Sequence, residues 1–306
     1  MRLPALMLMG LLIGAAPVDV PVGNFQTWLA FKKQPLAFDS GGIKVHVEAV
    51  PCPANPIGDS SCRWDGFNNQ ANVTVSSAGM SPITVKTDSQ SSYARIAVAR
   101  FHRGDRHLGI IIESQSGGSG GDMTLQMLIP SGSHYRIAQS NDPTDLHLQG
   151  QLADAPRDVS GDGSIDLKLE DAVFDSAFGC NACTPRPPKF LTVKNGKIID
   201  ESRDPGLRGA FAADMKRLAP ACLSQTQDRN GACAAFVADA ARAGQFDVAW
   251  NAMLKHYEHD GVLWEPCDLA PSEWKDHRCP EGHLTRFKSF PDSLRAFLIR
   301  TGYISA

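Results

Sequence analysis

Oxygen-bearing residues alternate along the segment DVSGDGSID at residues 158–166, in a pattern suited to holding a cation. Ca²⁺ takes about six to eight oxygen ligands, and a short loop can supply several of them. Gly163 follows the third of these residues, where a sharp turn requires a residue that tolerates positive φ. The predicted ligands are Asp158, Ser160, Asp162, Ser164 through its backbone carbonyl, and Asp166. We therefore expect a Ca²⁺-binding loop here; the alternative is an acidic turn exposed to solvent.

The residues after this loop predict a strand. Leu167 and Leu169 continue the alternation, and Leu169 stands at the position where an EF-hand loop has a bidentate Glu. A loop of the form D-x-S-G-D-G that feeds a strand resembles the calcium loops of FG-GAP-type repeats, which form the blades of integrin-like β-propellers. The resemblance implies that the loop joins two strands of one blade and that the ion fixes the shape of the loop.

A second segment repeats the pattern around the loop. Residues 102–113 align with residues 159–170, and the two copies are separated by about the length of a four-stranded blade. The first copy lacks two ligands, because Phe101 and Gly109 stand at the positions of the first and last ligand. The alternative interpretation is a chance similarity between two strand–turn–strand units.

The surroundings of these copies also resemble a group of exported bacterial proteins. The shared features include VARF at residues 98–101 and IIES at residues 111–114, and the similarity covers residues 94–204. This resemblance implies a location in the cell envelope and no particular reaction.

The first residues have the composition of a secretory signal peptide. An apolar run follows Arg2 and ends in Ala15 and Ala16, and at about fourteen residues it is too short to span a bilayer. We expect a signal peptide at residues 1–16 and a periplasmic or secreted mature chain without a membrane span. The 306 residues include 33 acidic and 30 basic ones, so the charge favours neither nucleic acid nor an anionic membrane as partner.

The cysteines predict disulfides, because an even number of them in an exported chain is typical of a disulfide framework. All eight fall into pairs that close short local loops. The predicted pairs are Cys52 with Cys62, Cys180 with Cys183, Cys222 with Cys233, and Cys267 with Cys279. Zinc or redox chemistry is the alternative for the C-x-x-C pair at residues 180–183. Zinc would need a second thiolate pair of similar spacing, and the prolines that follow do not suit the helix of a redox motif.

Hydrophobic periodicity predicts an α+β fold. Short alternating runs rich in Val, Ile and Thr predict antiparallel strands at residues 43–50, 71–75, 83–87, 94–101, 108–113, 123–129, 135–138 and 190–193. Apolar residues with helical spacing predict helices around residues 211–218, 232–243, 246–257 and 290–302. We therefore expect an antiparallel β domain with propeller-blade-like sheets at residues 17–204 and a small helical domain at residues 205–306.

Two groups of residues could support catalysis. Ser119 lies in the sequence GGSGG and satisfies G-x-S-x-G, but a strand instead of a helix is predicted after it, so a Gly/Ser hairpin is favoured. His256, Glu258 and His259 end a helix and could hold a metal, yet the metalloprotease spacing H-E-x-x-H is absent.

The sequence therefore predicts an exported, calcium-stabilised envelope protein that binds a protein or a glycan without catalysing a reaction. The alternative function is a hydrolase of envelope polymers that uses Ser119 or the His256/Glu258/His259 cluster. Neither the ligand nor the oligomeric state follows from the sequence.

Overall fold

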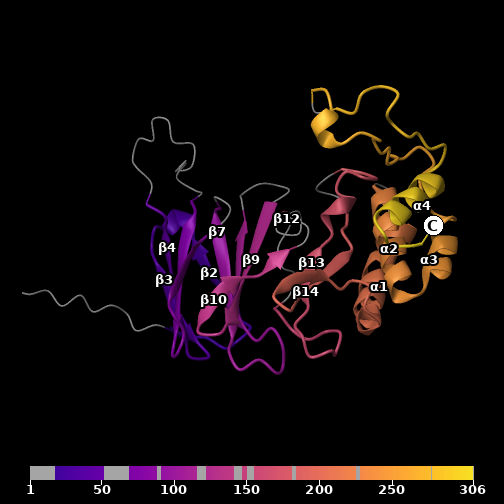
Figure 1. Cartoon of the computed structure of the whole chain (residues 1–306). Coiled ribbons are helices and arrows are strands. Elements are labelled where there is room, and N and C mark those ends of the chain that lie inside the picture. Colours follow the sequence, from indigo (N-terminus) through magenta and orange to yellow (C-terminus); the bar gives the residue numbers. More distant parts are fainter. Residues whose placement is uncertain are drawn as a thin grey trace, which may run out of the picture.

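The computed structural model describes residues 18–51, 69–87, 91–115, 122–140, 147–149, 155–180, 184–224, 228–276 and 278–305. Within these residues the chain forms three mostly antiparallel sheets followed by four α-helices, so the predicted α+β class is confirmed. The sheets and helices succeed one another in a row from the indigo end to the yellow end of the chain (Figure 1). The predicted signal peptide at residues 1–16 lies outside the described residues.

The first sheet shows the alternation that the sequence predicts. In β4, Ile43, Val45 and Val47 are buried while the residues between them are exposed. β1 runs parallel to β3, and the other neighbouring strands are antiparallel. In spatial order the strands are β1 (Val18–Asp19), β3 (Leu36–Ser40), β4 (Ile43–Ala49), β5 (Ala71–Ser77) and β6 (Ile83–Lys86).

The second sheet is buried on both of its faces. Ile110 and Ile112 of its central strand face the first sheet and join the same core. Ile111 of the same strand points the other way, into a core shared with the third sheet. The strands are β10 (His134–Ile137), β9 (Asp122–Ser131), β8 (Gly109–Gln115), β7 (Tyr93–Ala99) and β2 (Gln26–Leu29), with β12 (His147–Gln149) also paired to β9.

The third sheet connects the β-rich part to the helices. Leu191 and Val193 face the second sheet, whereas Phe190 on the opposite face meets Phe211 of the first helix with ring centroids 5.4 Å apart. Alternate residues of one strand thus complete two different cores, as the two-residue period of a strand requires. The strands are β11 (Gln139–Ser140), β15 (Lys197–Asp200), β14 (Pro188–Lys194) and β13 (Leu167–Glu170).

The turns of the two repeat copies lie side by side, one leading into β8 of the second sheet and the other into β13 of the third. The amide of Arg103 donates to the carbonyl of Gly163 at 2.7 Å, and the amide of Ile165 donates to the carbonyl of Phe101 at 2.9 Å. The sheets of the described chain form an open row (Figure 1). The resemblance to FG-GAP repeats stays a prediction.

The four helices pack around one aromatic and alanine-rich core. They are α1 (Arg208–Ser224), α2 (Arg229–Ala243), α3 (Phe246–Met253) and α4 (Phe290–Arg300). Ser289 caps α4 by accepting a hydrogen bond from the amide of Asp292, and Gly244 ends α2 in the left-handed conformation that glycine favours. Short 3₁₀ helices lie at η1 (Ala30–Lys32), η3 (Ala172–Phe174), η4 (Pro205–Leu207) and η5 (Pro271–Glu273).

A segment of the β-rich part completes this helical core. Phe174 meets Phe297 edge-on with ring centroids 5.0 Å apart, and Phe178 meets Phe290 in the same way at 5.2 Å. Both phenylalanines are almost fully buried and belong to the helical core. The predicted boundary at residue 205 therefore cuts the chain between two segments that share a core, and the division into 17–204 and 205–306 stays a prediction.

Two of the predicted disulfides, Cys222–Cys233 and Cys267–Cys279, are bonded in the structure. Cys180 is also disulfide-bonded, while its predicted partner Cys183 lies outside the described residues, as does the predicted pair of Cys52 and Cys62. None of the helices described is both long enough and apolar enough to cross a bilayer.

Candidate functional site

The predicted calcium loop is closed by its own carboxylates. Asp158 accepts hydrogen bonds from the amides of Gly161 at 2.7 Å and Gly163 at 3.1 Å. Asp162 accepts from the amide of Ser164 at 2.7 Å. Such side-chain bonds to nearby amides shape turns, and the positive φ of Gly161 and Gly163 suits the tight path of the backbone.

Asp166 lies under the loop and has only one of its two oxygens engaged. The side chain is 2 % exposed, and Oδ2 accepts from the amides of Val159 and Ser160, both at 2.7 Å. Within the described chain, Oδ1 of Asp166 and the hydroxyl of Ser160 are buried without a hydrogen-bond partner. A buried oxygen without a hydrogen-bond partner lowers the stability of the folded protein. Binding of a cation to these two oxygens would therefore stabilise the loop more than binding to its other atoms.

Two basic side chains already lie against the loop. Nζ of Lys194 is 2.9 Å from Oδ2 of Asp162 and also pairs with Glu201, while Arg103 is 3.3 Å from Asp158. The hydrogen bonds to Glu201 and Asp162 raise the pKa of Lys194, and the bond from Lys194 lowers the pKa of Asp162. The negative charge of the loop is therefore partly balanced by the side chains of Lys194 and Arg103.

The structure places all five predicted ligands on this one loop but does not bring their carboxylates to a single point. In the part of the chain that is described, no three His, Cys, Asp or Glu side chains are grouped so as to hold a metal. The donor set fits a calcium ion in its chemistry, through the free oxygens of Asp166 and Ser160. For Asp162 to coordinate the ion, the ion would have to displace the ammonium of Lys194 from the carboxylate or share the carboxylate with it.

A large open cavity lies beside the loop, and we call it the loop-side cavity. It has a volume of about 1040 Å³ and is bounded by the segment before β8, the β9–β10 turn, the predicted calcium loop and the β14–β15 turn. Its lining comprises Phe101, His102, Asp105, Arg106, His107, Ile129, Pro130, Gly132, Arg136, Asp162, Ser164, Val193, Lys194, Asn195 and Gly196. A cavity of this size is typical of ligand sites, which hold about 300–1,000 Å³.

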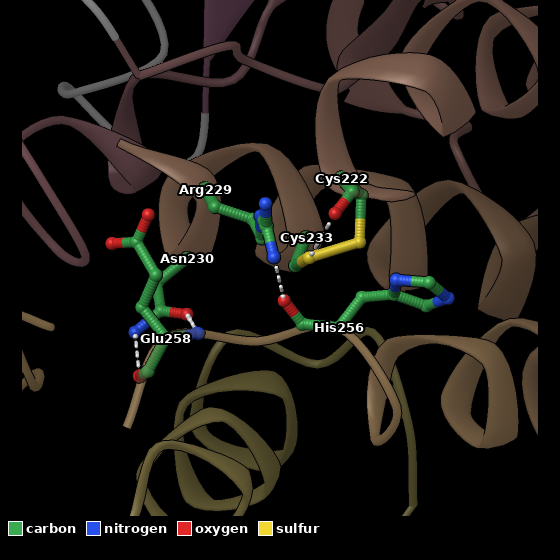
Figure 2. The surroundings of a disulfide bond; sticks show 6 residues. All are labelled: Cys222, Arg229, Asn230, Cys233, His256 and Glu258. Carbon is green, nitrogen blue, oxygen red and sulfur yellow. Dashed lines mark hydrogen bonds between the residues drawn. A yellow bond between two sulfur atoms is a disulfide. The ribbon is translucent and has the colours of Figure 1, made fainter. Parts of the chain in front are cut away.

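The catalytic candidates are not brought together in the described residues. The carbonyl of His256 accepts from Arg229 at 2.6 Å, and both backbone groups of Glu258 bond to the amide side chain of Asn230. Figure 2 shows the imidazole of His256 and the carboxylate of Glu258 pointing to opposite sides of this segment, next to the disulfide of Cys222. The segment is thus held through its backbone at the start of α2. Ser119 lies outside the described residues.

One strongly perturbed carboxyl was missed by the sequence reading. Asp239 of α2 is fully buried, and burial together with the nearby Asp214 raises its pKa to about 10. Both of its oxygens lack a hydrogen-bond donor among the described groups, and Asp214 is itself bonded twice to Arg217 at 2.9 Å. The one signal in the sequence is an acidic residue within the alanine-rich run of α2.

One family model matches the helical part of the chain, and two curated proteins match longer stretches. Residues 211–302, from within α1 to just after α4, match the model of the sll0997 C-terminal domain. The chain is 30% identical over 159 residues to "Probable thylakoid lumen protein sll0997" of Synechocystis sp., which covers 49% of this chain and 44% of that protein. It is 23% identical over 293 residues to "Uncharacterized protein y4bJ" of Sinorhizobium fredii, covering 91% and 42%.

The chain spans less than half the length of both curated relatives. No solved structure matches it.

Proposed function

We propose that this protein is an exported binding module of the periplasm or the extracellular space, and that its ligand, a protein or a glycan, occupies the loop-side cavity. The Synechocystis relative is named as a lumen protein, which supports a location outside the cytoplasm. The disulfides support the same location, since such bonds persist in oxidising compartments.

The observation that carries the proposal is the cavity itself. Four segments of the chain meet around it, and backbone hydrogen bonds join two of them, the segment before β8 and the predicted calcium loop. Binding costs less free energy when the site is already formed, because less chain has to be ordered on association. A preformed cavity built from loops of two neighbouring sheets is therefore suited to recognition.

Calcium belongs to the proposal as a stabiliser of one wall of this cavity. Asp162 and Ser164 line the cavity and also belong to the predicted set of calcium ligands. An ion held by Asp158, Ser160, Asp162, Ser164 and Asp166 would satisfy the free oxygens of the loop and hold that wall in place. It would act on shape and stability and would not take part in a reaction.

The positions of His256 and Glu258 support binding over catalysis by the His256/Glu258/His259 cluster. His256 and Glu258 point apart and are held through their backbones, so they form no acid–base pair. A general base must lie within about 3 Å of the group from which it removes a proton, and a nucleophile must lie within hydrogen-bond distance of its base.

The proposal is tested by two-dimensional ¹H–¹⁵N NMR titration of the folded protein with a panel of neutral and acidic oligosaccharides and short peptides, with and without Ca²⁺. We expect at least one ligand to shift the amide signals of the cavity lining, such as those of His107, Gly132 and Gly196, and to leave those of α3 unchanged. Shifts confined to other surfaces, or none with any ligand, would overturn the proposed site.

A further inference from the structure

We infer that the loop-side cavity takes an acidic glycan, whose carboxylates are held by the guanidinium groups of Arg106 and Arg136. This inference rests on the proposed function and specifies the chemistry of its ligand. The two arginines come from the segment before β8 and from β10, and both line the cavity.

The charges that line the cavity do not cancel. Asp162 is bonded to Lys194 at 2.9 Å and to the amide of Ser164. The other acidic side chain, Asp105, accepts a hydrogen bond from the amide of His102 at 2.9 Å. Both carboxylates are thus engaged within the wall.

The two arginines are not compensated in this way. Among the described residues no carboxylate forms an ion pair with Arg106 or Arg136, and both side chains are exposed to the cavity solvent. Guanidinium groups bind carboxylates through two parallel hydrogen bonds, which makes arginine the cation best suited to a planar anion. Two guanidinium groups without a carboxylate partner among the described residues therefore point to a ligand with more than one carboxylate.

Arg136 is held in position by the β14–β15 turn. Its Nη1 donates to the carbonyl of Gly196 at 3.5 Å, and a Cβ added at Gly196 would overlap the guanidinium. Gly196 and Asn195 both have positive φ, as a two-residue hairpin turn requires. The glycine thus gives the turn its shape and leaves room for the arginine above it.

The remaining lining suits sugar rings better than a lone anion. A volume of about 1040 Å³ is far larger than one phosphate ion needs, and Phe101, Ile129 and Val193 contribute apolar atoms below the charged rim. His102 adds a donor: its Nδ1 accepts from the amide of Gly104, so the neutral ring carries its proton on Nε2. That proton is available to a hydroxyl or carboxylate oxygen.

Isothermal titration calorimetry with three probes tests the inference: trigalacturonate as an acidic trisaccharide, maltotriose as a neutral one, and inorganic phosphate as a free anion. We expect trigalacturonate to bind and to lose affinity at least about tenfold in the Arg106→Gln/Arg136→Gln variant. Maltotriose and phosphate should bind at least about tenfold more weakly than trigalacturonate. Arg208→Gln removes an exposed cation from α1, away from the cavity, and should leave the affinity unchanged.

Three results would overturn the inference. They are unchanged trigalacturonate binding in the double variant, equal binding of phosphate and trigalacturonate, and absence of trigalacturonate binding at millimolar concentration. A fourth result, maltotriose binding in the cavity that is insensitive to the two arginine substitutions, would refute the acidic ligand and leave the proposed function standing. Circular dichroism of the double variant checks that it is folded, and Arg136→Lys separates loss of charge from loss of the planar guanidinium.

Discussion

The phenolic hydroxyl of Tyr303 donates a hydrogen bond of 2.8 Å to the carboxylate of Asp171, which joins the segment after α4 to the segment after β13. The ring of Tyr303 meets Phe174 edge-on at 5.5 Å, and the guanidinium of Arg242 lies 4.5 Å from its centre. Burial raises the pKa of both Tyr303 and Asp171. One hydrogen bond thus joins the first and the last segment of the chain that contribute to the helical core.

Replacing this tyrosine should destabilise the protein. Tyr303→Phe keeps the ring but leaves Asp171 without the hydroxyl donor, and we expect a loss of about 1–2 kcal/mol in the free energy of unfolding. Urea denaturation followed by circular dichroism measures it. Tyr257→Phe is the matched control, because the Tyr257 ring stacks on Phe290 and no hydrogen bond of its hydroxyl is seen among the described groups. Equal effects of the two substitutions would contradict the role of the Asp171 bond.

The buried carboxyl of Asp239 should make stability fall as the pH rises. Its pKa is raised from 3.8 in the unfolded chain to about 10 in the folded protein. The folded protein therefore keeps a proton that the unfolded chain releases. This contribution to stability is fully present below the unfolded pKa and is lost as the pH rises through the folded pKa, by at most about 1.4 kcal/mol per pH unit.

Asp239→Asn removes this titration. We expect the variant to be more stable than the wild type at pH 8, with a smaller difference at pH 5, in urea denaturation at both values. Asp247→Asn changes the same charge at an exposed position on α3 and should not alter the pH profile. Parallel profiles for wild type and Asp239→Asn would show that Asp239 is ionised in the folded state at neutral pH.

Calcium should raise the melting temperature through the loop. A ligand that binds only the folded state adds about 2.7 kcal/mol at a hundredfold excess over its dissociation constant. Melts in chelator and in millimolar Ca²⁺ should differ by several degrees, and Asp162→Ala should remove the difference. Asp260→Ala, at an exposed position, should retain it. Identical wild-type melts would refute the calcium loop.

Lys194 provides a second test of the same loop, because its ammonium occupies Oδ2 of Asp162. In Lys194→Met that oxygen is freed and a positive charge is lost, so Ca²⁺ should bind more tightly than to the wild type, at least severalfold. The stability without Ca²⁺ should fall, because Glu201 also loses its partner. An unchanged calcium affinity would show that the ion, if bound, does not use Asp162.

Gly206 is required by the close approach of the predicted calcium loop to the start of the helices. A Cβ at this position would overlap the carbonyl of Ser160. Gly206→Ala should therefore cost about 1–3 kcal/mol, as overpacking does. Gly209→Ala is the matched control, because a Cβ there meets nothing within 4 Å, and on the exposed face of α1 it should be neutral or stabilising. Similar melting temperatures for the two variants would contradict the contact.

Elements with a clear period were predictable from the sequence. The alternation in β4, the serine cap of α4 and the glycine end of α2 all follow from local rules and are present in the structure. β8 was harder to interpret, because both of its faces are covered and Glu113 is buried beside Arg95. A strand inside a stack of sheets loses the polar face that would mark its orientation.

The candidate site was predictable only in part, for a similar reason. The five predicted calcium ligands are close in sequence, so their spacing was visible there, and calcium binding by them stays a prediction. The cavity depends on Arg106, Arg136 and Lys194, which lie on three segments that meet only through tertiary packing. The contact of Phe174 and Phe178 with the helices was missed as well, since no local pattern shows which core an aromatic residue will join.

That contact has a consequence for how the chain divides. Residues 211–302 match one family model, yet two phenylalanines from the segment before them, Phe174 and Phe178, complete the core of those helices. A chain cut at residue 205 would leave a cavity in the helical core and would expose the rings of Phe174 and Phe178 on the β-rich fragment. We therefore expect heat or denaturant to melt the sheets and the helices in a single transition, because the two parts share these contacts.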